Sequence, residues 1–245
     1  MPIYEKATKF LMQDMAEEFA LLPGQSFSRD EVMDWFESNY PKIKKGTLTA
    51  NLIRLSVNAP SRFHHSPKPG EDDIFFQIDS GHFRLYDPAN DPTPIYTATD
   101  PTPEPPDNKQ AATGSEEFAY ERDLQNYLVK NLHLIKPGLK LYEDDEIRGI
   151  EFPAGGRFID ILAVDSDGAL VVIELKVSRG YDRVVGQLMR YMAWIAKNQA
   201  EEGQKVRGII IAREISEDLV MACSLLPNAQ LFEYQLSLSL RQIDP

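Results

Sequence analysis

Two apolar runs joined by a short turn constrain the fold of this chain more than any other feature. The runs span residues 156–162 and 170–176, and both are rich in isoleucine, leucine and valine, which is typical of buried strands. Residues 165–168, between them, read Asp-Ser-Asp-Gly, a composition that favours a turn. The pattern therefore predicts a buried β-hairpin at the centre of the fold.

Three charged side chains interrupt this apolar hairpin: Asp160, Glu174 and Lys176. Because strand side chains alternate between faces, Glu174 and Lys176 point the same way, and the neighbouring strand can bring Asp160 to that face. Two carboxylates that converge at the edge of a low-dielectric core repel each other, and a divalent cation removes the conflict. An oxygen-rich, incompletely filled shell suits Mg²⁺, with Mn²⁺ as its substitute. Lys176 could then orient an attacking water or stabilise charge on a scissile phosphate. The alternative is a structural ion cluster, since buried charges are usually paired.

The same residues resemble the PD-(D/E)xK nuclease superfamily, in which an acid is followed, after a short hairpin, by acid-x-Lys. More narrowly, about residues 117–235 resemble the RecB-like nuclease domain of the NucS mismatch-endonuclease family. The resemblance implies a mixed sheet flanked by helices and Mg²⁺-dependent hydrolysis of DNA phosphodiester bonds. Five blocks in the family's order carry it: Tyr120–Leu124 with Tyr127–Val129, Gly156–Leu162, Val172–Lys176, Gln187–Tyr191 and Val206–Ile210.

The resemblance also assigns roles to residues outside the hairpin. It makes Glu121, in a helix expected over residues 116–132, a further active-site acid, and it brings Gln187 and Tyr191 to the site. These two lie at i and i+4 and so share one face of a helix expected over residues 181–198. By pattern alone, Glu121 is an exposed helix acid, whereas for Gln187 and Tyr191 ordinary helix surface is an equal alternative. Candidate phosphate contacts, which could instead pair with surface acids, are Arg157, Arg179, Arg183 and Arg190.

Further apolar segments complete the expected nuclease half. Strands are expected over residues 139–147, 206–212 and 230–234, and a helix over residues 216–226. Cys223, the single cysteine, lies in this last helix, where packing is the expected role. One cysteine excludes an intramolecular disulfide and a cysteine-based metal site, and it is typical of a reducing cytoplasm. No run of about eighteen apolar residues predicts a membrane span, and the N-terminus lacks a signal-peptide pattern.

The first 90 residues show a different pattern. Apolar residues at helical spacing predict a helix over residues 4–19, and Ser28 with Glu31 forms a capping box for a second. Thr47 is the expected cap of a third. A hairpin is then expected over residues 74–86, with a turn at residues 79–81. Three short helices followed by a hairpin predict a winged helix-turn-helix whose third helix is the candidate DNA reader. The domain of NucS proteins at this end is β-rich, so mismatch recognition is not implied.

Charge distribution supports DNA binding by this half. The net charge of −12 argues against general nucleic-acid coating, yet no acid occurs from Ser38 to Gly70. Phosphate contact is one use of such a stretch, and docking of a basic face on the acidic nuclease half is the other. His64 and His65, without a third ligand nearby, are interpreted as loop residues. The candidate DNA contacts are Lys42, Lys44, Lys45, Arg54 and Arg62, with Lys68 in the same stretch.

A proline-rich segment divides the chain. We expect an α+β or α/β two-domain protein with a winged-helix-like domain at 1–90, a linker at 91–115 and a PD-(D/E)xK domain at 116–245. These features predict a cytoplasmic DNA endonuclease with site or structure selectivity, active in restriction, anti-phage defence or repair. Cleavage of both strands favours a homodimer. A catalytically idle DNA-binding or scaffolding protein, or an RNA-directed nuclease, remains the alternative.

Overall fold

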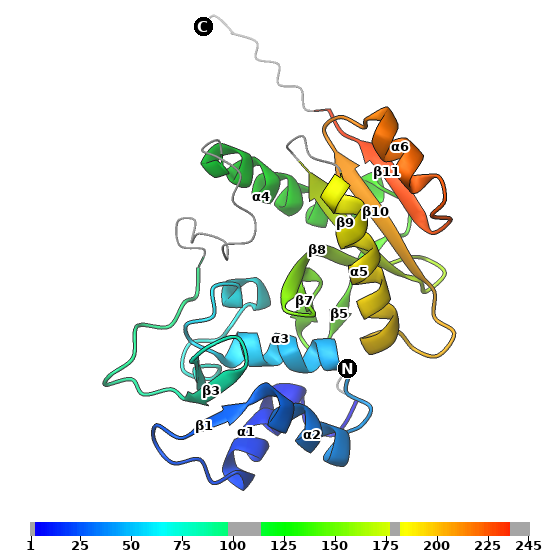
Figure 1. Ribbon diagram of the computed structural model, residues 1–245. Helices are drawn as coiled ribbons and strands as arrows, with labels where there is room; N and C mark the ends of the chain where they lie inside the picture. The colour runs from blue at the N-terminus through cyan, green and yellow to red at the C-terminus, as the bar shows by residue number, and fades with distance from the viewer. Residues whose placement is uncertain (1–2, 98–113, 177–181, 236–245) are drawn as a thin grey trace, which may run out of the picture.

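The capping box and the hairpin of the N-terminal part form as the sequence predicts. The computed structural model describes residues 3–97, 114–176 and 182–235 (Figure 1). Glu31 N donates to Ser28 Oγ at 3.2 Å while Glu31 Oε2 accepts from Ser28 N at 2.7 Å, so both free amides at the start of the second helix are satisfied. The elements are α1 (Thr8–Glu18), β1 (Ser26–Ser28), α2 (Arg29–Asn39), α3 (Lys45–Leu55), the 3₁₀ helix η1 (Arg62–His65), β2 (Phe75–Gln77) and β3 (His82–Leu85).

Three short strands form the small sheet of this part, in the antiparallel order β1-β3-β2. The sequence pattern does not predict strand β1, because its three residues are too few to show an alternation of apolar and polar positions. It nevertheless supplies Phe27, whose ring lies 5.2 Å from that of Phe75 and 5.8 Å from that of Phe83. The helices pack on this aromatic group through Phe36 and Leu52, which are both buried.

The expectation that Thr47 caps α3 is wrong. The helix starts earlier, with Lys44 at the N-cap position and no side-chain cap there. Thr47 is buried inside the helix, and its hydroxyl donates to Asp144 Oδ2 at 2.6 Å, across to the C-terminal part. A distant acid therefore takes the threonine hydroxyl that local sequence assigned to a cap.

The C-terminal part is a mixed α/β arrangement. Its main sheet has the order β11-β10-β9-β8-β4, with β7 also pairing with β8; β9, β10 and β11 are parallel and the other pairs antiparallel. The elements are α4 (Gly114–Lys130), η3 (Leu132–Leu134), β4 (Lys140–Leu141), β5 (Glu143–Asp144), β6 (Ile147–Arg148), β7 (Ile150–Ala154), β8 (Arg157–Val164), β9 (Leu170–Lys176), α5 (Asp182–Asn198), β10 (Val206–Ala212), α6 (Glu217–Cys223) and β11 (Ala229–Glu233).

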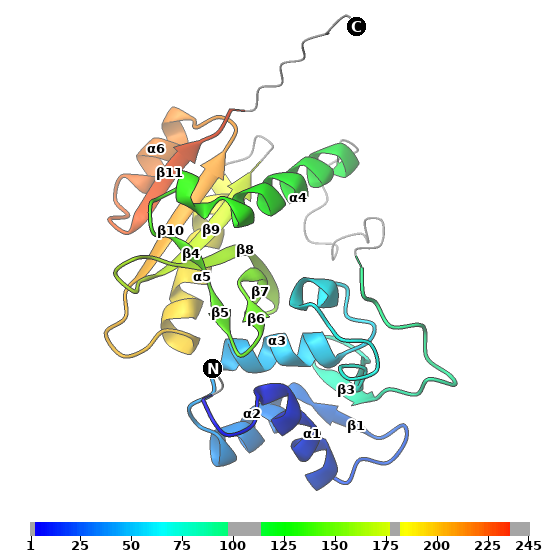
Figure 2. The ribbon, with the colours of Figure 1, turned by 180° about the vertical axis from the view of Figure 1, so that it is seen from behind.

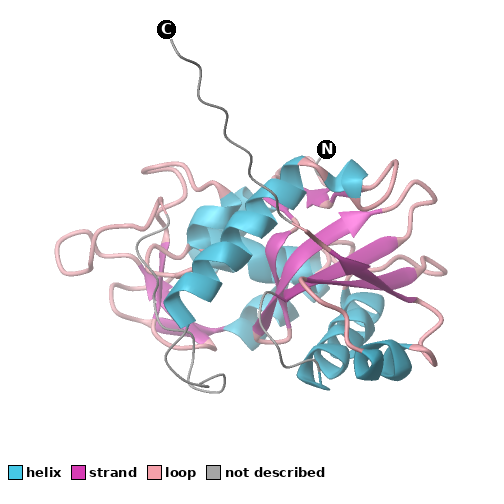
Figure 3. Cartoon of the chain, turned by 90° about the horizontal axis from the view of Figure 1, so that it is seen from above, coloured by secondary structure: helices cyan, strands magenta, loops and turns pink. Residues whose placement is uncertain are grey.

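Helices cover both faces of this sheet (Figures 1, 2 and 3). On one face, α5 packs through Leu188 against Val172 of β9; on the other, α4 packs through Leu124 against Ile173. The buried hairpin β8–β9 is confirmed as the centre of the sheet. The strand expected over residues 139–147 is instead divided into β4, β5 and β6, and β7 follows them. Cys223 is buried in α6, consistent with packing.

Helix α3 belongs to both parts of the molecule. Leu48, Leu52 and Leu55 lie in the N-terminal core, whereas Ala50 lies in the core around β7 and α5. At the start of the helix, a Cβ on Gly46 would come within 2.9 Å of the Phe152 ring, so the close contact with β7 requires glycine. The third helix is thus enclosed between the two parts.

The contacts of the N-terminal part extend beyond residue 90. Residues 91–97 still belong to the N-terminal part, because Arg84 pairs with Asp91 and Ile95 N donates to Val57 O at 2.9 Å. Residues 98–113 lie outside the described part of the chain. Within the described ranges, no helix is both long and apolar enough to cross a membrane.

Candidate active site

Asp160 and Glu174 face each other where the β8–β9 ladder ends. The last recorded pair is Ile161 with Ile173, so the next opposing positions are Asp160 and Glu174. There the Asp160 carboxylate, rather than a backbone carbonyl, accepts a hydrogen bond from Leu175 N at 2.6 Å. The hairpin register therefore brings the two predicted acids together at one end of the central strands.

The carboxyl group of Glu174 lies in surroundings that disfavour its ionisation. Its side chain is 0% exposed, and Oε2 accepts from Gln187 Nε2 at 2.8 Å, whereas Oε1 has no hydrogen-bond partner among the residues that the structure describes. Burial raises the pKa of Glu174 well above its ordinary value, and the charge of Asp160 raises it further, while Lys176 acts in the opposite direction. A buried carboxylate oxygen without a partner is costly, so this atom indicates a ligand.

The donor set fits a hard divalent cation. Among the residues that the structure describes, no group of three histidines, cysteines or acids is arranged to hold one ion. Two protein carboxylates would therefore share the cation with several waters, the shell that Mg²⁺ favours beside phosphate. The positive charge would also allow Asp160 and Glu174 to ionise together, which their proximity otherwise opposes.

Lys176 and Glu121 meet beside this pair. The Lys176 ammonium lies 3.7 Å from Glu121 Oε1, which joins the end of β9 to α4. Both side chains are partly exposed, at 28% and 32%, so the lysine remains accessible to a substrate at the end of the strand. Glu121, the helix acid predicted for the site, thus lies near it as a partner of Lys176.

Gln187 and Tyr191 lie one turn apart on α5, against Glu174. Gln187 Nε2 lies 3.4 Å from Tyr191 Oη and also donates to Glu174. Tyr191 is 2% exposed, and burial with the charge of Glu174 raises the pKa of its phenol to about 12. Both side chains face the sheet, so the helix-surface alternative does not hold for them.

Two further polar residues adjoin the acids and were missed from the sequence. Gln125, on α4, donates through Nε2 to Glu151 Oε1 at 2.9 Å and to the carbonyl of Asp160 at 2.8 Å. Gln125 lies four residues after Glu121, so their shared helix face was a signal that could have revealed it. Glu151, between Ile150 and Phe152 in the overlooked strand β7, had the polar position of an alternating strand.

The predicted DNA contacts divide into exposed and buried cations. Exposed side chains are those of Lys42, Lys45, Arg157, Arg183 and Arg190, whereas Arg179 lies outside the described residues. Lys44 pairs with Glu201 at 2.9 Å, between the N- and C-terminal parts. The Arg190 guanidinium lies over the Tyr191 ring, 5.2 Å from its centroid, which places one exposed cation next to the acids.

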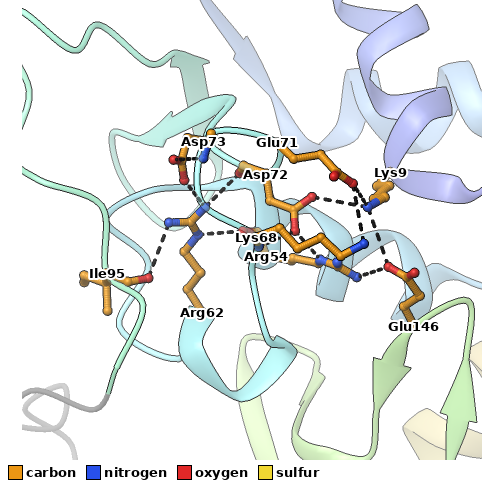
Figure 4. A network of polar contacts seen from close by, with 10 residues as sticks. Lys9, Arg54, Arg62, Lys68, Glu71, Asp72, Asp73, Ile95 and Glu146 are labelled. Carbon is orange, nitrogen blue, oxygen red and sulfur yellow. Dashed lines mark hydrogen bonds and ion pairs between the residues drawn. The ribbon is translucent and has the colours of Figure 1, made fainter.

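Arg54 and Arg62 are buried in ion pairs rather than exposed to a phosphate, which corrects the expectation for both (Figure 4). Arg54 is 2% exposed and pairs at 2.9 Å with Asp72 and with Glu146 of the C-terminal part. Arg62 is 0% exposed and donates to the carbonyls of Arg54 and Asp72 at 2.7 and 2.8 Å, and to Asp73 at 2.5 Å. With these cations buried and α3 enclosed, the docking alternative describes this region better than phosphate reading by α3.

The two histidines of the acid-free stretch are also interior groups. Burial lowers the pKa of His65 to about 3 and that of His64 to about 4, the latter with help from Arg122 on α4. Both rings are therefore neutral at neutral pH and add no positive charge. They lie in η1, rather than in the loop that was expected.

Comparison with known proteins agrees with the division of the sequence. Residues 120–237 match the endonuclease NucS C-terminal domain. The C-terminal half is NucS-like. Residues 7–85 match a domain of unknown function, DUF7669, and so the N-terminal half is not NucS-like, as predicted.

Curated relatives give the same assignment. Endonuclease NucS of Pyrococcus abyssi is 35% identical over 109 residues, or 44% of this chain, and that of Thermococcus kodakarensis is 35% identical over 107 residues, or 43%. The chain spans only 37% and 36% of the lengths of these relatives. The crystal structure of a repair endonuclease from Pyrococcus abyssi aligns over 52% of this chain and 50% of its own, at 24% identity and a TM-score of 0.39.

Proposed function

We propose that this chain is a Mg²⁺-dependent DNA endonuclease, with Mn²⁺ as a substitute ion, that acts in DNA repair or in restriction and anti-phage defence. One observation carries the proposal: Asp160 meets a fully buried Glu174 whose Oε1 lacks a hydrogen-bond partner within the described part of the chain. The curated relatives of the C-terminal half are named endonuclease NucS, which supports the same activity.

The residues divide the work as follows. Asp160 and Glu174 would hold the cation, which when bound acidifies water and neutralises phosphate charge. Lys176, accessible at the end of β9, donates hydrogen bonds to the scissile phosphate as negative charge develops there. Gln187 fixes the rotamer of Glu174 by bonding Oε2, and Tyr191 supports Gln187. Both are positioning residues.

Glu121 has a part in this arrangement through Lys176. Its carboxylate lies 3.7 Å from the ammonium and directs the lysine along the end of the strand. The exposed Arg157, Arg183 and Arg190 would contact the phosphates that flank the cleaved bond. DNA is thus bound across the ends of β8 and β9, where the acids lie.

The N-terminal part is proposed to be a winged-helix-like domain. Its element order α1-β1-α2-α3-β2-β3, with a hairpin after the third helix, supports this. We place the linker after Thr97 and the nuclease domain from residue 116. Since α3 is enclosed, selectivity would come from Lys42 and Lys45, which precede or open this helix with exposed side chains, on a domain fixed beside the nuclease.

Assembly follows from the chemistry. Cleavage of both strands of a duplex usually requires two active sites, so we propose a homodimer. Its mass in solution, measured by light scattering over a range of concentrations, tests this. A monomer at all concentrations that still makes double-strand breaks contradicts it.

The test of the proposed function is a cleavage assay on several nucleic acids. The purified chain is incubated with plasmid, mismatched, branched and single-stranded DNA, and with RNA, in Mg²⁺, Mn²⁺ or excess EDTA. DNA cleavage with either ion and none in EDTA is expected. Cleavage that persists in EDTA refutes the metal mechanism; cleavage of RNA alone assigns an RNA nuclease; DNA binding without any cleavage indicates an idle scaffold.

A further inference from the structure

Glu151 has a backbone that glutamate rarely adopts. Its φ is +46°, in the left-handed region, although the residue lies within strand β7. Side chains with a Cβ are disfavoured there, and such outliers persist only where the surroundings enforce them. Both flanking residues, Ile150 and Phe152, are buried, so the strand fixes the backbone on either side of the acid.

The strained residue lies directly opposite Asp160. The β7–β8 register pairs Ile150 with Ile161 and Phe152 with Ile159, which makes Glu151 and Asp160 the opposing positions between them. Glu151 and Asp160 are therefore neighbours across the β7–β8 pair.

A buried amide ties Glu151 to the same site. Gln125 is 3% exposed, and its Nε2 donates both to Glu151 Oε1 at 2.9 Å and to the carbonyl of Asp160 at 2.8 Å. This single group fixes the acid relative to the backbone of Asp160. Glu151 is also close enough for its charge to raise the pKa of Glu174.

An independent observation indicates that a ligand enters among these acids. Glu174 faces Asp160 across the hairpin and is completely buried, and its Oε1 has no hydrogen-bond partner in residues 3–97, 114–176 and 182–235. Within the described residues, three acids do not surround one point closely enough to ligate an ion together. Glu151 would therefore act on the waters of a cation held by the other two.

We propose that Glu151 is a further functional acid of the site, a positioning residue that accepts hydrogen bonds from waters of the cation held by Asp160 and Glu174. The inference rests on the proposed nuclease function. This role explains the strained backbone of Glu151, because the side chain is directed at the site although its φ is unfavourable. Gln125 would keep the carboxylate aligned in the absence of the cation.

The first test is Glu151→Gln, which keeps size and removes charge. Mn²⁺ is titrated calorimetrically into the full chain without DNA, and cleavage is measured separately. Losing such an outer acid is expected to reduce Mn²⁺ affinity or cleavage rate by about 10–100-fold. Glu202→Gln, in an exposed turn, is the matched control and should leave both unchanged. If Glu151→Gln binds Mn²⁺ and cleaves within twofold of the wild type, the inference is overturned.

A second variant separates function from folding. Glycine tolerates φ of +46°, so Glu151→Gly should keep or raise the melting temperature of the metal-free protein, by about 2–4 °C, while cleavage falls. A lower melting temperature with normal cleavage would make Glu151 a structural partner of Gln125 and overturn the inference. If the wild type itself does not cleave DNA with Mn²⁺, the proposed function fails first, which distinguishes the two failures.

Discussion

Replacing Arg54 by methionine tests whether the basic stretch holds the molecule together or reads DNA. The guanidinium is 2% exposed and pairs with two acids, the fully buried Asp72 and the half-exposed Glu146. Methionine fills a similar volume but removes the charge. Asp72 then keeps a bond from Lys68 N at 2.8 Å and a longer contact of 3.6 Å with Lys9.

The magnitude follows from the burial of Asp72. Removing one partner of a buried ion pair leaves an uncompensated charge and costs about 3–5 kcal/mol. For a chain of this size, about 2–4 °C of melting temperature accompanies each kcal/mol, so the loss should be about 6–20 °C. Glu146→Gln removes only the half-exposed partner, and should cost about 0–1 kcal/mol.

The assay pairs thermal unfolding with DNA binding at several salt concentrations. At a temperature where it remains folded, Arg54→Met should leave the slope of log K against log salt unchanged, because the residue touches no phosphate. The exposed pair Lys42 and Lys45 is the matched control: replacing both with glutamine should lower the slope by about two units and leave stability intact. A flatter slope in Arg54→Met with an unchanged melting temperature would refute this account.

Further predictions concern the acids and the residues around them. Lys176→Ala should retain Mn²⁺ binding but slow single-turnover cleavage by about 10²–10³-fold; a normal rate would make the lysine a structural partner of Glu121. Gln187→Ala should slow cleavage less, through loss of the bond to Glu174, as measured in the same assay. The raised pKa of Glu174 means that its ionisation opposes folding once the pH exceeds the ordinary carboxyl range. Metal-free Glu174→Gln should therefore have a higher melting temperature than the wild type at neutral pH. The difference should shrink as the pH falls toward the ordinary carboxyl pKa and disappear below it; a difference that does not change with pH would contradict this.

The central hairpin could be predicted because the residues that specify it lie close together in the sequence. Apolar β-branched runs, a turn of Asp and Gly, and three charges at fixed spacing predict both the strands and the meeting of Asp160 with Glu174. The capping box at Ser28 was predictable for the same reason, since its two bonds lie within four residues. Strand β7 could not be predicted, because Pro153 ends the alternation that Ile150, Glu151 and Phe152 begin.

The role of the basic stretch could not be predicted locally. Arg54 pairs with Glu146, on the turn between β5 and β6, and Thr47 bonds to Asp144 at the end of β5, both far away in the sequence. That turn also places Asp145 on the free backbone amide of Thr8, at the start of α1. A gap in acidic residues therefore indicated a positively charged surface that long-range contacts convert into an interface.

The most direct test of the central claim is plasmid cleavage by Asp160→Ala beside the wild type, over a titration of Mn²⁺. We expect the wild type to cleave in proportion to bound ion. The variant should lose Mn²⁺ binding and all cleavage at every concentration, while its affinity for DNA without metal remains unchanged. Cleavage by Asp160→Ala at the wild-type rate would contradict the assignment of the metal site to Asp160 and Glu174.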